Sequence, residues 1–192
     1  MGKGRLEAFS DGVIAIIITI MVLELRPPHG FQFRDLRELA PTALSYALSF
    51  TYVGIYWNNH HHMLNVAQSV NGAILWANMH LLFWLSLNPF VTAWLGENPL
   101  ATAPVALYGG VQIMCAVAYT ILSQTLIHRE GPDSVLARAT GADRKGKLSL
   151  ALYAAAVAVA FYRPTVSLVL YLAVAMIWFI PDKRIERTLE VS

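Results

Sequence analysis

The fold class is decided by residues 5–23, which read RLEAFSDGVIAIIITIMVL. Arg5, Ser10 and Asp11 lie directly before the uncharged run Gly12–Leu23. Ionisable side chains at the end of a membrane-spanning helix are costly, and they usually have a function. We therefore interpret this stretch as the beginning of a membrane helix that carries a functional motif.

The composition of the whole chain agrees with a membrane protein. Of its 192 residues, 56% are hydrophobic and only 14% are charged, whereas a soluble domain has roughly a quarter charged residues. The apolar residues form long blocks between short polar gaps, which indicates an all-α membrane protein. We expect residues 1–192 to form one domain. The net charge of +2 is too small to indicate a nucleic-acid partner.

The apolar blocks predict six transmembrane helices. Their expected ranges are about 6–25, 41 to 59 or 62, 71–95, 104–127, 148–162 and 165–180. A span needs about 20 apolar residues, so the last two are short. Only Arg163-Pro164 separates them, which predicts a tight helical hairpin.

The distribution of basic residues predicts the orientation in the membrane. With a cytoplasmic N-terminus, the inner segments hold ten Lys and Arg residues: Lys3, Arg5, Arg129, Arg138, Arg144, Lys145, Lys147, Lys183, Arg184 and Arg187. The outer segments hold four: Arg26, Arg34, Arg37 and Arg163. Basic residues accumulate in cytoplasmic loops. We therefore expect a multi-pass protein of the plasma membrane with both termini in the cytoplasm.

The first helix has two different faces when its residues are placed about 100° apart. One face is an aliphatic stripe, about 60° wide, formed by Ile16, Ile20 and Leu23. Thr19 lies beside this stripe, whereas Ser10 and Asp11 point away from it. Spacing alone allows the stripe to face either lipid or a central axis.

The polar residues of the first helix need partners elsewhere. Arg5 and Asp11 are six positions apart, so they cannot pair well on one helix. The predicted topology brings further polar residues to the same cytoplasmic half of the bundle: Trp57, the run His60-His61-His62, Asn78 and His80. A buried hydrogen-bond network there would fix the rotation of the first helix.

The motif Arg5-x-x-x-Phe9-Ser10-Asp11 at the head of the first span resembles the transmembrane protein 175 family of potassium channels. Six spans and a cytoplasmic N-terminus also fit its single-repeat prokaryotic members. The resemblance implies a homotetramer in which the first helix of each subunit lines a central pore. It assigns the constriction to Ile16, further apolar rings to Ile20 and Leu23, and support of potassium preference to Thr19. The partners of the motif would be Trp57, His61 and Asn78.

The resemblance implies potassium permeation with modest selectivity and no cofactor. The chain has no Thr-Val-Gly-Tyr-Gly loop, so a ring of backbone carbonyls does not replace the water shell of the ion. An isoleucine ring offers no ligands, and potassium loses its water more easily than sodium does. Such a ring would act as filter and gate, since a hydrophobic constriction can close by dewetting. The expected partners are other copies of the chain, the lipid bilayer and monovalent cations.

Other functions stay open at this point. The run His60-His61-His62 could suggest a metal enzyme, but consecutive histidines on a helix point in different directions, and no His-Glu-x-x-His motif accompanies them. We therefore expect neither a catalytic nor a metal site. A secondary transporter would need broken helices, for which Gly109-Gly110 is a candidate. A proton-permeable cation channel and a membrane scaffold without transport are further alternatives.

Overall fold

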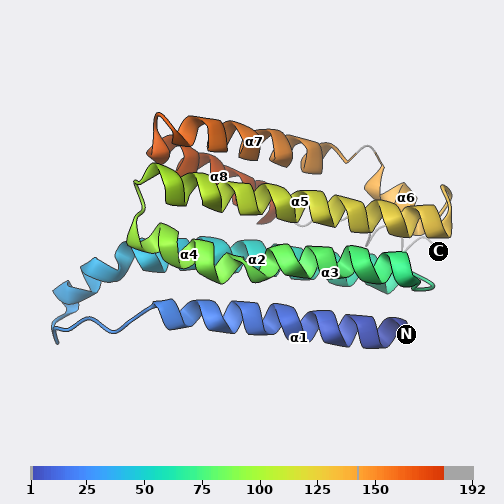
Figure 1. Ribbon diagram of the computed structural model, residues 1–192, viewed down its shortest axis with the longest axis horizontal. Helices are drawn as coiled ribbons and strands as arrows, with labels where there is room; N and C mark the ends of the chain where they lie inside the picture. Colours follow the sequence, from blue (N-terminus) through green and yellow to red (C-terminus); the bar gives the residue numbers. More distant parts are fainter. Residues whose placement is uncertain (1, 142, 180–192) are drawn as a thin grey trace.

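The computed structural model describes residues 2–141 and 143–179, which form an all-helical bundle (Figure 1). The helices are α1 (Lys3–Met21), α2 (Ala40–Val66), α3 (Gly72–Ser86), α4 (Asn88–Glu97), α5 (Thr102–Glu130), α6 (Val135–Thr140), α7 (Arg144–Ala160) and α8 (Pro164–Phe179). Two 3₁₀ segments, η1 (Val22–Glu24) and η2 (Phe33–Leu39), follow α1. The predicted all-α class is confirmed for the described residues.

Most helix ends differ from the sequence-based ranges. α2 continues past His62 to Val66 because Met63 and Leu64 are fully buried and their packing stabilises a further turn. The expected loop 128–147 contains α6, whose Ser134 accepts a hydrogen bond from the amide of Ala137 at 3.2 Å. Residue 180, the expected end of the last span, lies outside the described residues.

The expected third span consists of two helices, α3 and α4, which meet at Leu87. Pro89 has no amide hydrogen to donate to the carbonyl four residues earlier, that of Leu85. Asn88 Nδ2 donates to this carbonyl instead, at 3.0 Å, and Gln112 Nε2 of α5 donates to Asn88 Oδ1 at 2.8 Å. The break is thus stabilised by a side chain from a neighbouring helix.

The long helices lie side by side along the long axis of the molecule (Figure 1). α1 forms one edge and packs against α2, α3 and α4. α5 contacts α3 and α4 on one side and α7 on the other, and α7 pairs with α8. This order leaves the outer face of α1 without a partner among residues 2–141 and 143–179.

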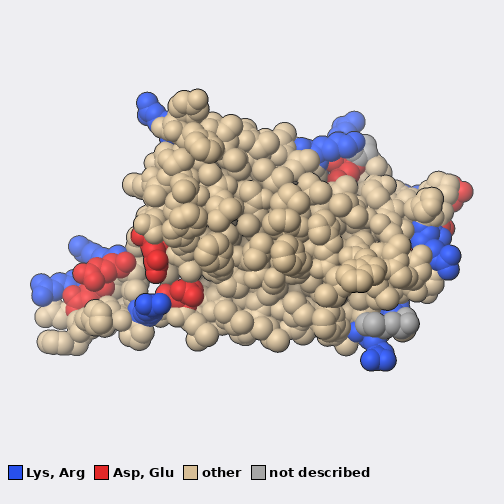
Figure 2. Space-filling view, in the orientation of Figure 1, with Lys and Arg blue, Asp and Glu red and all other residues tan. Residues whose placement is uncertain are grey.

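Three helical segments are long and apolar enough to cross a membrane among the residues that the structure describes: Lys3–Glu24, Gly72–Glu97 and Thr102–Glu130. Pro164–Phe179 is apolar but shorter. Figure 2 shows charged side chains at the two ends of the molecule and an uncharged surface between them. Six spans remain a prediction, since α2 carries the polar run Asn58–His62 and α7 has only 17 residues.

The predicted cytoplasmic segments lie together at one end of the bundle. The N-terminus, the turn between α2 and α3, and α6 are at the right in Figure 1, whereas η2 and the α7–α8 turn are at the left. The basic residues Lys183, Arg184 and Arg187 fall outside the described residues. The arrangement is compatible with the expected orientation, which stays a prediction.

Candidate functional site

The two faces of α1 have opposite environments. Its buried residues are Leu6, Ser10, Ile14, Ile17 and Met21, which recur every three or four positions and face the bundle. On the other side the exposed fractions are 58% for Ile16, 43% for Ile20 and 72% for Leu23. The aliphatic stripe is therefore free of intramolecular contacts for much of its area, while the serine of the motif is buried.

A directional chain of hydrogen bonds ties the buried face of α1 to α2 and α3. His60 Nε2 lies 2.7 Å from Asn78 Oδ1, and Asn78 Nδ2 donates to Ser10 Oγ at 2.9 Å. Ser10 Oγ donates in turn to the carbonyl of Leu6 at 2.8 Å. An amide oxygen only accepts, so His60 Nε2 is the donor in the first bond. All three side chains are buried, and their mutual bonds compensate for the loss of water.

Two further bonds fix the N-terminal half of α1. Trp57 Nε1 of α2 donates to Asp11 Oδ1 at 3.0 Å, and Lys3 Nζ donates to the carbonyl of Asn65 at 2.7 Å. Asp11 is half-buried, so its carboxylate is shielded by α2 without leaving water completely. Polar bonds thus set both the depth and the rotation of α1 at this end.

The histidine that joins this network is His60. The sequence analysis favoured His61, which is exposed and stacks on Trp57 with ring centroids 6.2 Å apart. The sequence contained a signal for His60, because the apolar residues Val53 and Leu64 lie seven positions before and four positions after it, and both are buried in the structure. Helical spacing therefore places His60, and not His61, on the inner face.

The remaining motif residues are not part of the network. His80 accepts a hydrogen bond from Trp84 Nε1 of its own helix at 2.9 Å. Arg5 is exposed and makes no ion pair with a described residue, and Phe9 is 47% exposed. Arg5 and Phe9 lie on the free surface of α1, like the aliphatic stripe.

Thr19 lies at the free surface of α1, near Ile16. Its hydroxyl is 3.0 Å from the carbonyls of both Ala15 and Ile16. The hydroxyl hydrogen is used within the helix, so the oxygen lone pairs stay available on the exposed side. Thr19 is thus a polar acceptor next to an otherwise apolar row.

The histidine run does not form a metal centre in the part of the chain that the structure describes. No group of three His, Cys, Asp or Glu side chains there is arranged to hold a metal ion. His60 points into the bundle, where it bonds to Asn78, whereas His61 is exposed and contacts the rings of Trp57 and His62. These consecutive histidines therefore point in different directions, as the sequence analysis expects for neighbours on a helix.

The fold and this site define a helical membrane protein whose first helix is anchored by polar bonds on one face and bears a free aliphatic row on the other. The chain belongs to the TMEM175 family. The profile of this family, described as the endosomal/lysosomal potassium channel TMEM175, matches residues 5–89. The resemblance inferred from the motif is confirmed, and the family and its relatives are named as ion channels, not enzymes.

Three relatives show how far the similarity extends. A potassium channel of Chryseobacterium sp. (strain P1-3) is 53% identical over 190 residues, which cover 99% of both chains. The crystal structure of a lysosomal potassium-selective channel TMEM175 homolog from Chamaesiphon minutus superposes with a TM-score of 0.76 at 27% identity, covering 94% of this chain and 97% of that one. The human endosomal/lysosomal proton channel TMEM175 is 33% identical over 113 residues, 53% of this chain and 20% of its own length.

Proposed function

We propose that this chain is a potassium-permeable channel formed by four copies, with α1 of each copy lining the central pore. The supporting observation is the division of α1 into a buried, bonded face and a free aliphatic face. A pore helix needs this division, because its outer face must be held by its own subunit while its inner row meets the permeating ion. The names of the bacterial relatives support potassium as the ion.

In this proposal the narrowest point is a ring of four Ile16 side chains, followed by rings of Ile20 and Leu23. Aliphatic side chains cannot replace the water that an ion loses, so the ring favours the ion with the weaker hydration shell and can close by dewetting. Thr19 supplies a polar oxygen beside this ring. Ser10 and Asp11 serve as anchors, since their polar atoms bond to α2 and α3.

We also propose how the channel is placed in the membrane. Residues 1–192 act as one channel domain that crosses the plasma membrane six times, with both termini in the cytoplasm. The uncharged surface between the charged ends of the molecule supports the membrane placement (Figure 2), and the excess of Lys and Arg in the segments assigned to the cytoplasm supports the orientation. The channel uses no cofactor, and its partners are lipid, monovalent cations and identical copies.

Single-channel recording of the reconstituted protein, with potassium and sodium on opposite sides, tests the proposal. We expect a reversal potential that favours potassium in the wild type. Ile16→Asn should move it towards zero, because an amide ring can bind the ion and lower the barrier for sodium. Ile121→Asn, the same change at a residue of α5 that is 43% exposed, is the control and should leave it unchanged. Silence of the wild type, or equal shifts in both variants, would contradict the proposal.

Proton permeation is a second candidate function, since the human relative is named a proton channel. A pH gradient across the same bilayer, with no potassium gradient, distinguishes the two. A current that reverses at the proton equilibrium potential would support proton permeation, whereas a current that follows potassium alone would exclude it.

A further inference from the structure

We propose that a pocket between α2, α5 and α7 binds a membrane amphiphile with an anionic head group and an apolar chain. The cavity has a volume of about 340 Å³, within the range of small-molecule sites. It lies towards α7, on the side of the bundle opposite α1 (Figure 1). The pocket is therefore separate from the aliphatic row to which the channel function was assigned.

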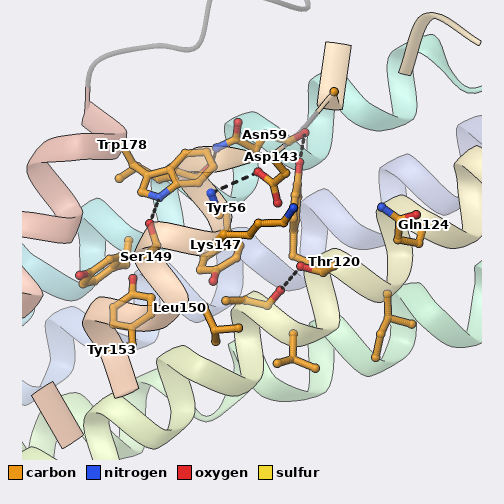
Figure 3. A pocket seen from close by; sticks show the side chains of 18 residues that line it. Tyr56, Asn59, Thr120, Gln124, Asp143, Lys147, Ser149, Leu150, Tyr153 and Trp178 are labelled. Carbon is orange, nitrogen blue, oxygen red and sulfur yellow. Dashed lines mark hydrogen bonds between the residues drawn. The ribbon is translucent and has the colours of Figure 1, made fainter. Parts of the chain in front are cut away.

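The inner part of the pocket is apolar and suits a hydrocarbon chain. Three helices line it, through Ile55 of α2, Val117 of α5 and Tyr153 of α7, of which Tyr153 is labelled in Figure 3. At its rim lie Ile121 and Leu150, whose side chains are 43% and 38% exposed. Exposed aliphatic residues in the membrane-facing part of a bundle contact lipid, so a chain can enter the pocket sideways from the bilayer.

The outer end of the pocket is polar and offers a positive charge. Lys147 lines it and is exposed, and its side-chain ammonium makes no hydrogen bond or ion pair with another described residue. Asp143 keeps its negative charge, but its Oδ1 accepts the amide of Gly146 at 3.1 Å and caps α7, which holds the carboxylate at the start of the helix. The three cations Arg144, Lys145 and Lys147 outnumber this carboxylate there, and of the three only Lys147 lines the pocket. Its ammonium therefore favours an anionic ligand.

The distance between the two parts fits an amphiphile. Lys147 and Tyr153 are six residues apart on α7, about 9 Å along the helix axis. A head group at Lys147 therefore leaves its chain to run along α7 towards Tyr153. The predicted orientation places Lys147 at the cytoplasmic leaflet, where anionic lipids attract basic residues.

The surroundings favour an anion over an organic cation. Lys and Arg side chains gather beside an acidic group at the upper right of Figure 2, and at the start of α7 Arg144, Lys145 and Lys147 outnumber Asp143. The ring of Trp178, which could have held a cation, already lies 5.9 Å from Lys145 Nζ. Its Nε1 donates to Ser149 Oγ at 2.7 Å (Figure 3), so its orientation is fixed.

Native mass spectrometry of the purified full-length protein tests this inference through binding, without reference to conduction. The protein is incubated with phosphatidylglycerol, with a long-chain fatty acid, or with phosphatidylcholine of matched chains. We expect at least one of the two anionic amphiphiles to bind more tightly than phosphatidylcholine. Phosphatidylglycerol alone would identify a phosphate head group, and the fatty acid alone a carboxylate. Equal binding of all three, or of phosphatidylcholine best, overturns the inference.

Two pairs of variants locate the ligand. Val117→Phe fills the pocket and should abolish the preference, whereas Val169→Phe makes the same change on the exposed face of α8 and should preserve it. Lys147→Gln should weaken the binding about fivefold, the contribution of one basic residue near an anionic head group. Arg129→Gln removes a positive charge outside the pocket and should have no effect.

Unchanged binding in Val117→Phe, or equal losses in the members of either pair, would overturn the proposed location. Size-exclusion chromatography must show that each variant elutes like the wild type. If Val117→Phe does not, Leu150→Phe at the rim takes its place with the same expected result.

Discussion

At the scale of single residues, the contribution of a polar side chain to stability depends on whether its hydrogen-bond partners are also buried. Asn78 satisfies two neighbours at once, since it accepts from His60 and donates to Ser10. Neither neighbour has access to water. A bond of this kind contributes little when made but costs much when one partner is removed.

We therefore expect Asn78→Leu to destabilise the protein by about 1–3 kcal/mol, because His60 and Ser10 lose their buried partner. Thermal unfolding in detergent, followed by circular dichroism, should show a midpoint several degrees lower. Asn58→Leu changes an exposed asparagine of α2 and should leave the midpoint nearly unchanged. Equal midpoints for Asn78→Leu and the wild type would show that the network does not stabilise the fold.

A milder effect is expected at Asp11, which is half-buried and bonds to Trp57. Trp57→Phe keeps the aromatic ring but removes the indole donor, so we expect a loss of about 1 kcal/mol. Asp11→Ala should cost a similar amount, and the double variant should cost less than the sum of both. A fully additive double-mutant cycle would show that this bond is energetically silent.

At the scale of helices, the sequence predicted the long helical segments but not where they end, and it missed the short helix α6 and the division of the third block into α3 and α4. Long apolar blocks and the basic residues between them are local signals, so the number and order of the blocks could be read directly. The ends depend on contacts between distant segments, such as the burial of Met63 and Leu64 beyond the histidine run. The bond from Gln112 to Asn88 at the α3–α4 break joins two blocks and has no local signal.

The candidate site also combines features that local helical spacing predicts with features that depend on contacts between distant segments. Helical spacing alone separated Ser10 from Ile16, and the structure buries the first and exposes the second. Spacing could also have selected His60, had its buried neighbours in α2 been considered together with it. The resemblance named Trp57 as a partner of the motif, but the sequence did not indicate that it bonds to Asp11, because this bond depends on how deep α2 lies against α1.

Gly109 and Gly110 of α5 differ in how closely neighbouring side chains approach them, so substitutions at the two positions test how tightly α5 is packed. α5 is continuous through both residues, so they do not break the helix. A Cβ at Gly109 would overlap the Tyr171 hydroxyl and lie 2.6 Å from Val157 Cγ2, whereas nothing lies within 4 Å of one at Gly110. We expect Gly109→Ala to destabilise by about 1–3 kcal/mol through overpacking and Gly110→Ala to be neutral or stabilising. Thermal unfolding distinguishes them, and equal midpoints would contradict the close contact.

At the scale of the whole molecule, the orientation in the membrane can be tested with introduced cysteines. The native Cys115 is fully buried, which leaves a low background for labelling. Asp133 and Arg163 are both exposed, at opposite ends of the bundle. With a cytoplasmic N-terminus, a membrane-impermeant maleimide added to intact cells should label Arg163→Cys but not Asp133→Cys. The reverse pattern would invert the proposed topology.

The N–H···O bonds that join α1 to α2 and α3 lie in its N-terminal half, at Lys3, Ser10 and Asp11, whereas at its other end the buried Met21 Sδ receives only a long contact from Thr92 Oγ1, at 3.9 Å. A tilt of α1 about this N-terminal region displaces each residue in proportion to its distance from it. Ile16 lies about 9 Å beyond Ser10 and Leu23 about 20 Å beyond it. A tilt of about 5° would therefore displace Ile16 by roughly 0.8 Å and Leu23 by roughly 1.7 Å. In the proposed pore, such a tilt would change the radius at Ile16 less than the radius at Leu23, so one rigid helix could combine a nearly constant constriction with a wider, variable mouth.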